Sequence, residues 1–304
     1  INKAIVTEKI EGMENFISEH KFQDFKIDQR IIRAILAKGY DAPTPIQDRI
    51  ISHIIDGSDV VGIANTGTGK TAAFLIPLIN KILLNPKEQV LIVTPTRELA
   101  IQIDQEFKFF AKGMRIFSVC CVGGMSIGKQ ISELRYNYNL IIGTPGRLKD
   151  LIERRMINLS RFNTVVLDEA DRMLDMGFIQ DTRFIMNGLP KEKQVLFFSA
   201  TIPYSVEKII KEFLINPIRV SVKTRDTSSN VDQDIVRIEQ GKTKIDVLDN
   251  LLIKEEFTKV LIFGRTKHGV ERLSKILIQK GFRAESIHGN KNNSQRQKAL
   301  TMFK

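Results

Sequence analysis

The 304-residue sequence contains no tryptophan, only two cysteines and no long apolar run. No apolar stretch approaches the roughly 18 residues that a membrane-spanning helix needs, and the mixed, charged residues 1–16 do not resemble a secretory signal. Cys120 and Cys121 are neighbours, so in a strand they would point to opposite faces, which argues against a shared metal. We expect both thiols to be buried in a strand, in a protein of a reducing cytoplasm.

Acidic residues are the scarcer charged class, with 35 against 46 lysines and arginines. The basic excess is concentrated late in the chain, because residues 223–304 carry 17 basic and 10 acidic side chains. A basic excess favours a polyanionic partner, but it is equally typical of a well-solvated surface. Charge alone leaves both interpretations open.

Short apolar runs dominate the first two thirds of the sequence. Each is followed by a turn or a helical pattern, and the runs are 60–64, 90–95, 117–122, 140–145, 165–170 and 195–200. Continuous apolar runs are typical of strands buried on both faces. Their alternation with helical patterns, such as that at 30–40, predicts an α/β fold with a parallel sheet covered by helices on both faces.

A polar segment at 223–233 separates two parts of the sequence. We expect an N-terminal extension at 1–21, a complete α/β domain at 22–222, a linker at 223–233 and a partial second α/β domain at 234–304. In the second part, the apolar runs 234–238, 259–264 and 284–289 predict two or three further strands, with a helical stretch before the last.

The segment "ANTGTGKT" at 64–71 follows one predicted strand and precedes a predicted helix. This is the setting of a phosphate-binding loop, in which backbone N–H groups and a helix N-terminus surround phosphate oxygens. Lys70 would reach the β- and γ-phosphates and the Thr71 hydroxyl would bind Mg²⁺. The alternative, a chance glycine-rich turn, is disfavoured by this context.

The segment "VVLDEAD" places Asp168 and Glu169 at the carboxyl end of a predicted strand, where parallel sheets bind ligands. Asp168 could hold Mg²⁺, and Glu169 could accept a proton from an attacking water. In "GYDAPTPIQ" at 39–47, Gln47 could pair with the adenine edge and Tyr40 could stack on the base. Taken alone, this last segment is more typical of a proline-stiffened loop.

Together these segments resemble the DEAD-box RNA helicases, ATP-dependent enzymes with two RecA-like domains. The motifs follow the order of that family, and the resemblance runs from Phe22 to the last residue. They are "GYDAPTPIQ", "ANTGTGKT", "PTRELA" (95–100), "GG" (123–124), "TPGR" (144–147), "DEAD" (168–171) and "SAT" (199–201).

The resemblance implies a role for each motif. Phe22, Tyr40 and Gln47 would form the adenine pocket, and Thr66, Gly67, Thr68, Gly69, Lys70 and Thr71 would hold ATP phosphates and Mg²⁺. Asp168 and Glu169 would position metal and water, and Ser199 and Thr201 would couple the nucleotide state to the arrangement of the domains. RNA sugar and phosphate would contact Pro95, Thr96, Arg97, Gly123, Gly124, Thr144, Pro145, Gly146 and Arg147, with little sequence specificity.

In the second part, "LIFGRTK" resembles a further motif in which Arg265 would contact RNA. The Gln-x-x-Arg pattern of the family keeps Arg296 but has Asn293 in place of the glutamine, and His288 is expected to be structural. The segment "HGNK" at 288–291 is similar to the corresponding segment of the bacterial RhlE-like branch.

The His-Arg-x-Gly-Arg pattern, which carries arginine fingers in the family, does not occur in residues 233–304. We therefore expect Lys304 to be a cut within the second domain. A chain ending there is expected to bind adenine nucleotides but to show little RNA-stimulated hydrolysis or unwinding.

The resemblance favours an ATP-dependent RNA helicase that separates short duplexes. A second interpretation is a nucleotide-gated RNA clamp without productive turnover. The transporter ATPases are disfavoured, because the sequence contains no Leu-Ser-Gly-Gly-type signature.

Overall fold

The structure is a computed structural model that describes residues 7–9, 18–222, 232 and 234–303. The chain divides into two compact units, Ile1–Ser228 and Ser229–Lys304, each considered by itself below. Most of the predicted linker at 223–233 lies outside the described residues. No helix among the described residues is long and apolar enough to cross a membrane.

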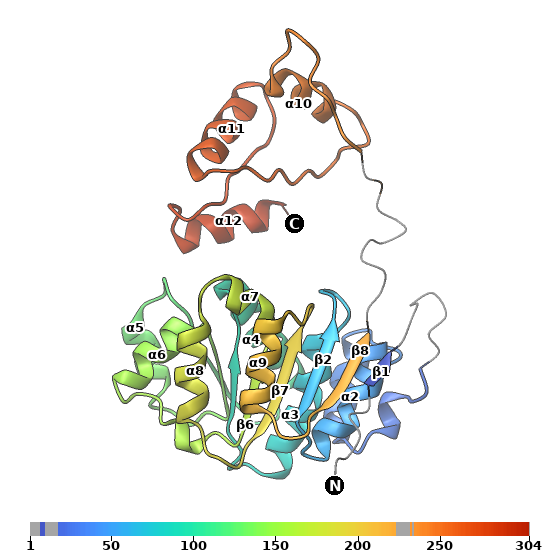
Figure 1. The fold of residues 1–304 in the computed structure, drawn as a ribbon, viewed down its shortest axis with the longest axis vertical. Coiled ribbons are helices and arrows are strands. Elements are labelled where there is room, and N and C mark those ends of the chain that lie inside the picture. Colours follow the sequence, from blue (N-terminus) through green and yellow to red (C-terminus); the bar gives the residue numbers. More distant parts are fainter. Residues whose placement is uncertain (1–6, 10–17, 223–231, 233, 304) are drawn as a thin grey trace. The chain divides into compact units, whose positions relative to one another are not determined.

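The first unit is built on an eight-stranded sheet in which every pairing is parallel (Figure 1). Its strand order is β1-β8-β2-β7-β6-β3-β5-β4. The strands are β1 Thr7–Lys9, β2 Val60–Ala64, β3 Val90–Val93, β4 Ser118–Cys121, β5 Leu140–Gly143, β6 Thr164–Leu167, β7 Gln194–Ser199 and β8 Ile218–Val222.

Helices cover both faces of this sheet, and each face has its own apolar core. The first face packs against η1 Phe22–Asp24, α1 Gln29–Ala37, α2 Pro45–Ile55, α3 Lys70–Leu84 and α4 Arg97–Phe110. The second face packs against α5 Ile127–Glu133, α6 Pro145–Glu153, η2 Leu159–Arg161, α7 Ala170–Asp175, α8 Ile179–Gly188 and α9 Tyr204–Phe213. The predicted α/β class, with a parallel sheet between two helical layers, is confirmed.

Local sequence accounts for where these helices begin. The side chain of Asp28 accepts a hydrogen bond from Arg30 N at 2.8 Å and so caps α1. Pro45 and Pro145 occupy the first positions of α2 and α6, where a missing N–H costs nothing. Thr96 caps α4 by accepting from Leu99 N at 3.3 Å.

All six predicted strands of the first unit are present; β2 has the predicted bounds, and the ends of the others differ from the predicted ones by at most three residues. Two further strands, β1 and β8, were not predicted; β1 is a three-residue polar segment within the predicted N-terminal extension, and it pairs with β8. Cys121 is buried as expected, whereas Cys120 is only partly buried. That expectation was wrong for Cys120 because β4 is an edge strand whose two faces are unequally covered.

The described residues of the second unit form three helices, α10 Lys244–Leu252, α11 Lys267–Gln279 and α12 Asn293–Phe303. The strands predicted at 234–238, 259–264 and 284–289 are absent from the described residues of this unit, so that expectation was wrong here. A strand needs a neighbour to pair with, and these segments have none among the described residues. Apolar side chains in two of them, Ile235, Leu261 and Phe263, are 84%, 64% and 90% exposed.

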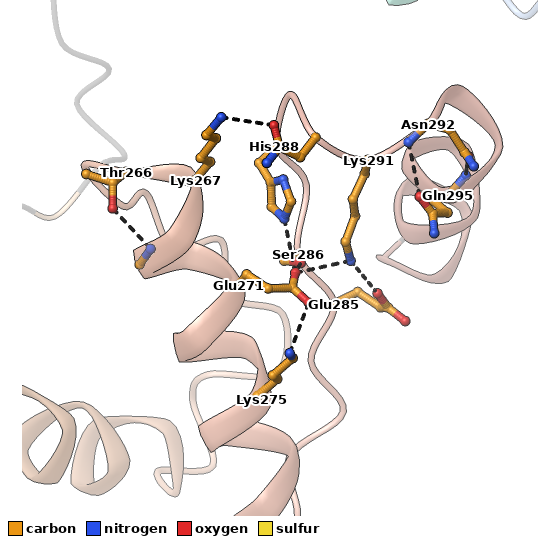
Figure 2. A network of polar contacts seen from close by, with 12 residues as sticks. Thr266, Lys267, Glu271, Lys275, Glu285, Ser286, His288, Lys291, Asn292 and Gln295 are labelled. Atoms are coloured by element: carbon orange, nitrogen blue, oxygen red, sulfur yellow. Dashed lines mark hydrogen bonds and ion pairs between the residues drawn. The ribbon is translucent and has the colours of Figure 1, made fainter.

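A network of polar contacts joins α11 to the segment that precedes α12 (Figure 2). The Glu271 carboxylate on α11 accepts a hydrogen bond from Ser286 Oγ at 2.5 Å and lies 3.0 Å from His288 Nε2. These hydrogen bonds, from Ser286 first, lower the pKa of Glu271 to about 2. Lys291 Nζ lies 3.7 Å from the same carboxylate. His288 thus contacts α11 through Glu271, and its structural role stays a prediction.

Candidate nucleotide and nucleic-acid site

The phosphate loop of residues 65–69 connects the carboxyl end of β2 to the first residue of α3, Lys70. Gly67 and Gly69 have φ values of +85° and +90°, which L side chains rarely adopt. A Cβ on Gly69 would also lie 2.5 Å from Nε2 of Gln47. Lys70 is buried, and its Nζ donates to Ala64 O at 2.6 Å. The loop thus has a backbone shape that suits a phosphate group, and the Lys70 side chain that follows it is hydrogen-bonded to the last residue of β2.

Gln47 connects the segment "PTPIQ" to this loop. Its Oε1 accepts from Thr44 N at 3.0 Å, and its Nε2 donates to Gly69 O at 3.1 Å. The side chain is buried. A primary amide has a second lone pair and a second N–H, so these two bonds leave one acceptor and one donor position for a base. The adenine-reading role of Gln47 stays a prediction that this geometry permits.

The two aromatic residues predicted for the adenine pocket have different surroundings. Phe22 is 1% exposed and packs near Phe25 in the first core. Tyr40 packs beside Phe110 of α4, and its hydroxyl donates to Glu106 Oε1 at 3.2 Å. Burial, together with the Glu106 carboxylate, raises the pKa of Tyr40 to about 12. Because these contacts hold Tyr40 on α4, they lend no support to base stacking by this ring.

The upstream segment is tied to α2 next to Gln47. The buried carboxylate of Asp48 accepts from Glu19 N at 2.9 Å and lies 2.8 Å from His20 Nδ1. The contact between His20 and Asp48 was not predicted, because nothing in the sequence marks two partners separated by 28 residues.

Asp168 and Glu169 lie directly after β6, at the same edge of the sheet as the phosphate loop. Asp168 is 2% exposed. Burial raises the pKa of Asp168 to about 6, although the Lys70 charge opposes the increase. Glu169 adopts a left-handed conformation with φ of +49°, and its N–H donates to Asp168 Oδ1 at 3.0 Å. Arg172 donates to Glu169 Oε2 at 2.8 Å.

The segment "SAT" meets the last residue of "DEAD". Asp171 accepts from the backbone N–H and the hydroxyl of Thr201 at 2.9 and 2.8 Å. Asp171 N donates to Ser199 Oγ at 3.3 Å, and Ser199 Oγ donates to Thr201 O at 2.7 Å. Burial alone would raise the pKa of Asp171, but its hydrogen bonds with Thr201 and Ser199 lower it below its ordinary value. These bonds join the start of α7 to the end of β7.

The residues predicted to contact RNA gather at the carboxyl ends of β3, β4 and β5. A Cβ on Gly124 would overlap the Arg97 guanidinium, so this glycine is required for the side chain to lie against the 123–124 turn. Arg147 on α6 donates to Met125 O at 3.3 Å and to Gln130 Oε1 at 3.0 Å. The other predicted contacts are at the starts of the helices that follow β3 and β5, namely Pro95, Thr96, Thr144, Pro145 and Gly146. The structure therefore brings three separate motifs together at one edge of the sheet.

Two of the predicted residues, Arg265 and Thr66, lie apart from the contacts described above. Arg265 lies in the second unit and is exposed. Thr66 is exposed at the tip of the phosphate loop.

The residues of the loop suit a magnesium nucleotide. Asp168 is a desolvated carboxylate near the Lys70 charge, and a Cβ on Gly69 would meet the side chains of Gln47 and Thr44. Thr71 follows in the first turn of α3. No group of three or more histidine, cysteine, aspartate or glutamate residues in the described part of the chain could hold a metal. That finding is compatible with Mg²⁺, which takes only one or two protein ligands when phosphates supply others.

Comparison with known proteins settles the family. A profile of the DEAD/DEAH box helicases matches residues 44–209, and one of the helicase conserved C-terminal domain matches residues 243–304. The chain belongs to the DEAD/DEAH box helicase family. The first match lies within the first unit of the chain and the second match within the second unit.

Curated relatives and a solved structure support this assignment. The chain is 44% identical over 287 residues to the DEAD-box ATP-dependent RNA helicase CshA of Bacillus subtilis, covering 93% of the chain and 58% of the relative. It is 40% identical over 286 residues to the ATP-dependent RNA helicase CshA of Listeria monocytogenes, covering 93% and 55%. A crystal structure of a DEAD box protein from Methanococcus jannaschii matches with a TM-score of 0.64 and 36% identity, covering 93% of this chain and 77% of that one.

The chain therefore spans less than two thirds of the length of these curated relatives. The similarity to the RhlE-like branch stays a prediction. Sequence reasoning missed Asp171, Arg172 and Gln130 as members of the site, because their importance depends on contacts between motifs.

Proposed function

We propose that the protein containing this chain is an ATP-dependent RNA helicase, which couples RNA-stimulated ATP hydrolysis to the local separation of short duplexes. The observation that carries the proposal is that the predicted nucleotide-binding and RNA-binding residues lie at one edge of the sheet. There, the phosphate loop and the Asp168–Glu169 pair lie at the ends of β2 and β6, while Arg97 and Arg147 follow β3 and β5. A nucleotide and a polyanion can therefore bind the same edge.

The chain's own residues would divide the chemistry. On nucleotide binding, Lys70 would exchange its bond to Ala64 O for phosphate oxygens. Thr71 and Asp168 would hold Mg²⁺, which supplies positive charge to the phosphates when bound. Glu169 would orient the attacking water and accept its proton, while Arg172 holds the Glu169 side chain in place.

RNA would bind through its backbone. Arg97 and Arg147 present guanidinium groups, which suit phosphate oxygens geometrically. Contacts of this kind carry little sequence information, so we expect single strands and short duplexes of varied sequence to bind. The Asp171–Ser199–Thr201 bonds would transmit the nucleotide state from the loop after β6 to the loop after β7. We place the protein in the cytoplasm.

The deciding experiment measures phosphate release with and without RNA in the full-length protein. We expect RNA to stimulate release, and Glu169→Gln to abolish the stimulation while retaining nucleotide binding. The competing candidate is the nucleotide-gated RNA clamp without turnover. RNA binding that depends on ATP, with no phosphate release above background, would favour the clamp.

A further inference from the structure

Gln130 is a buried polar residue next to the predicted RNA-binding edge. It lies in the middle of α5 and is only 2% exposed. Its Nε2 donates to Val122 O at 3.0 Å, and its Oε1 accepts from Arg147 NH1 at 3.0 Å. A single amide thus joins the end of β4 to the first turn of α6.

The other contacts of Arg147 show what this amide contributes. The same NH1 group donates to Met125 O at 3.3 Å, on the turn that Gln130 fixes through Val122. Asp150 lies at the limit of an ion pair, 4.0 Å from Nε, and its side chain is 38% exposed. The near partners of the guanidinium are therefore neutral oxygens, and the charge of Arg147 is left largely uncompensated.

We propose that Gln130 is a positioning residue for RNA binding, which holds the Arg147 guanidinium against the 122–125 turn while leaving its charge for a phosphate. The inference rests on the proposed RNA contact of Arg147. The turn also carries Gly123 and Gly124, against which the Arg97 guanidinium lies. One amide therefore bonds to Arg147 directly and also holds the start of the turn against which Arg97 lies.

The chemistry of the side chain follows from this role. A carboxylate at position 130 would pair with Arg147 and reduce its attraction for phosphate. An apolar side chain would leave the buried carbonyl of Val122 without its donor and free Arg147 to adopt other rotamers. Only a neutral side chain that donates to Val122 O and accepts from Arg147 can hold the turn without neutralising the Arg147 charge.

The test uses Gln130→Met and Gln130→Glu in the full-length protein. Gln194→Met is the matched control, because Gln194 is also a buried glutamine. Its amide joins Ile54 O and Ser58 O to Lys81 Nζ, away from the RNA-binding edge. The probe is a fluorescent ten-nucleotide oligouridylate, titrated at several KCl concentrations in the presence of a non-hydrolysable ATP analogue.

We expect both Gln130 variants to weaken oligouridylate binding by on the order of tenfold, the effect of losing one hydrogen bond to a charged group. The slope of log Kd against log salt should become shallower by about 0.7, the value for one phosphate contact on a single strand. Affinity for the ATP analogue without RNA should be unchanged. Gln194→Met should lower the melting temperature and leave the salt slope unchanged.

The Arg147→Ala background separates the possible failures. Gln130→Met should have no further effect there, because Gln130 acts through Arg147. If Arg147→Ala itself leaves affinity and salt slope unchanged, the proposed RNA contact is wrong. If Arg147→Ala weakens binding but neither Gln130 variant does, or if the two changes are additive, the positioning role is wrong. Should Gln130→Met fail to fold, Gln130→Glu alone decides, since it keeps the volume and an acceptor for Arg147.

Discussion

Gln47 illustrates how one side chain serves both fold and specificity. Its amide already joins Thr44 N to Gly69 O, so any base must use its remaining donor and acceptor. That pair matches the adenine edge and mismatches guanine, and a mismatched site leaves its own polar groups unpaired. We expect ADP to bind more tightly than GDP in equilibrium titrations, and Gln47→Ala to narrow the difference. Equal affinities for the two nucleotides in the unmodified protein would contradict this reading.

Lys70 and Glu169 should be separable by mutation. Glu169→Gln keeps the size and the hydrogen bond to Arg172 but cannot accept a proton, so Mg-ATP affinity should be retained while hydrolysis is lost. Lys70→Ala removes a cation from the phosphate cradle and should weaken ATP binding itself, by at least tenfold. Titration with a fluorescent ATP analogue checks both. The assigned roles fail if Glu169→Gln abolishes binding to the same extent as Lys70→Ala.

At the scale of elements, Asp171 joins the start of α7 to the end of β7. Because its pKa is lower in the folded state than its ordinary value of 3.8, its ionised form stabilises the fold above that pH. The contribution is lost as the pH falls through the lower folded-state value. We expect Asp171→Asn to reduce the free energy of unfolding by about 2 kcal/mol at pH 7.

Urea unfolding of the nucleotide-free protein measures this difference. The effect of Asp171→Asn should be constant well above pH 3.8 and should shrink as the pH falls below 3.8 through the lower folded-state pKa. Thr201→Val, which removes one of the two donors, should cost less than Asp171→Asn at pH 7. A penalty for Asp171→Asn that stays constant with pH would show that the carboxylate charge contributes nothing.

The elements of the first unit were predictable where burial alone decides them. β3, β5 and β6 are fully buried, and each contains at least three consecutive apolar residues in the sequence. β1 was not predictable, because "TEK" has no apolar pattern and its pairing depends on β8, more than 200 residues away.

The same limit applies to the prediction of the site. Motifs predicted the positions of Lys70, Asp168 and Arg147, whereas the contacts of Tyr40 with Glu106 and of Gln130 with Arg147 arise only when distant segments meet.

At the scale of the whole molecule, the two units differ in how they are stabilised. The first unit buries two apolar cores around a paired sheet. The described part of the second unit has no strand pairing, and it exposes apolar side chains in segments that have strand-like sequences. Amides without a ladder partner exchange readily with solvent, whereas those of core strands open only with the global unfolding free energy.

Amide hydrogen exchange of the 304-residue chain should therefore separate the units. We expect strong protection in β3, β5, β6 and β7, and rapid exchange at 234–238, 259–264 and 284–288. α11 should be intermediate, because its Glu271 side chain is bonded to Ser286 and His288 but few of its apolar residues are buried. The helices of the second unit supply the internal control, because their backbone amides are hydrogen-bonded within each helix and need no neighbouring strand. Protection at 259–264 comparable to that of β6 would mean that this segment pairs as a strand in solution, contrary to the arrangement described here.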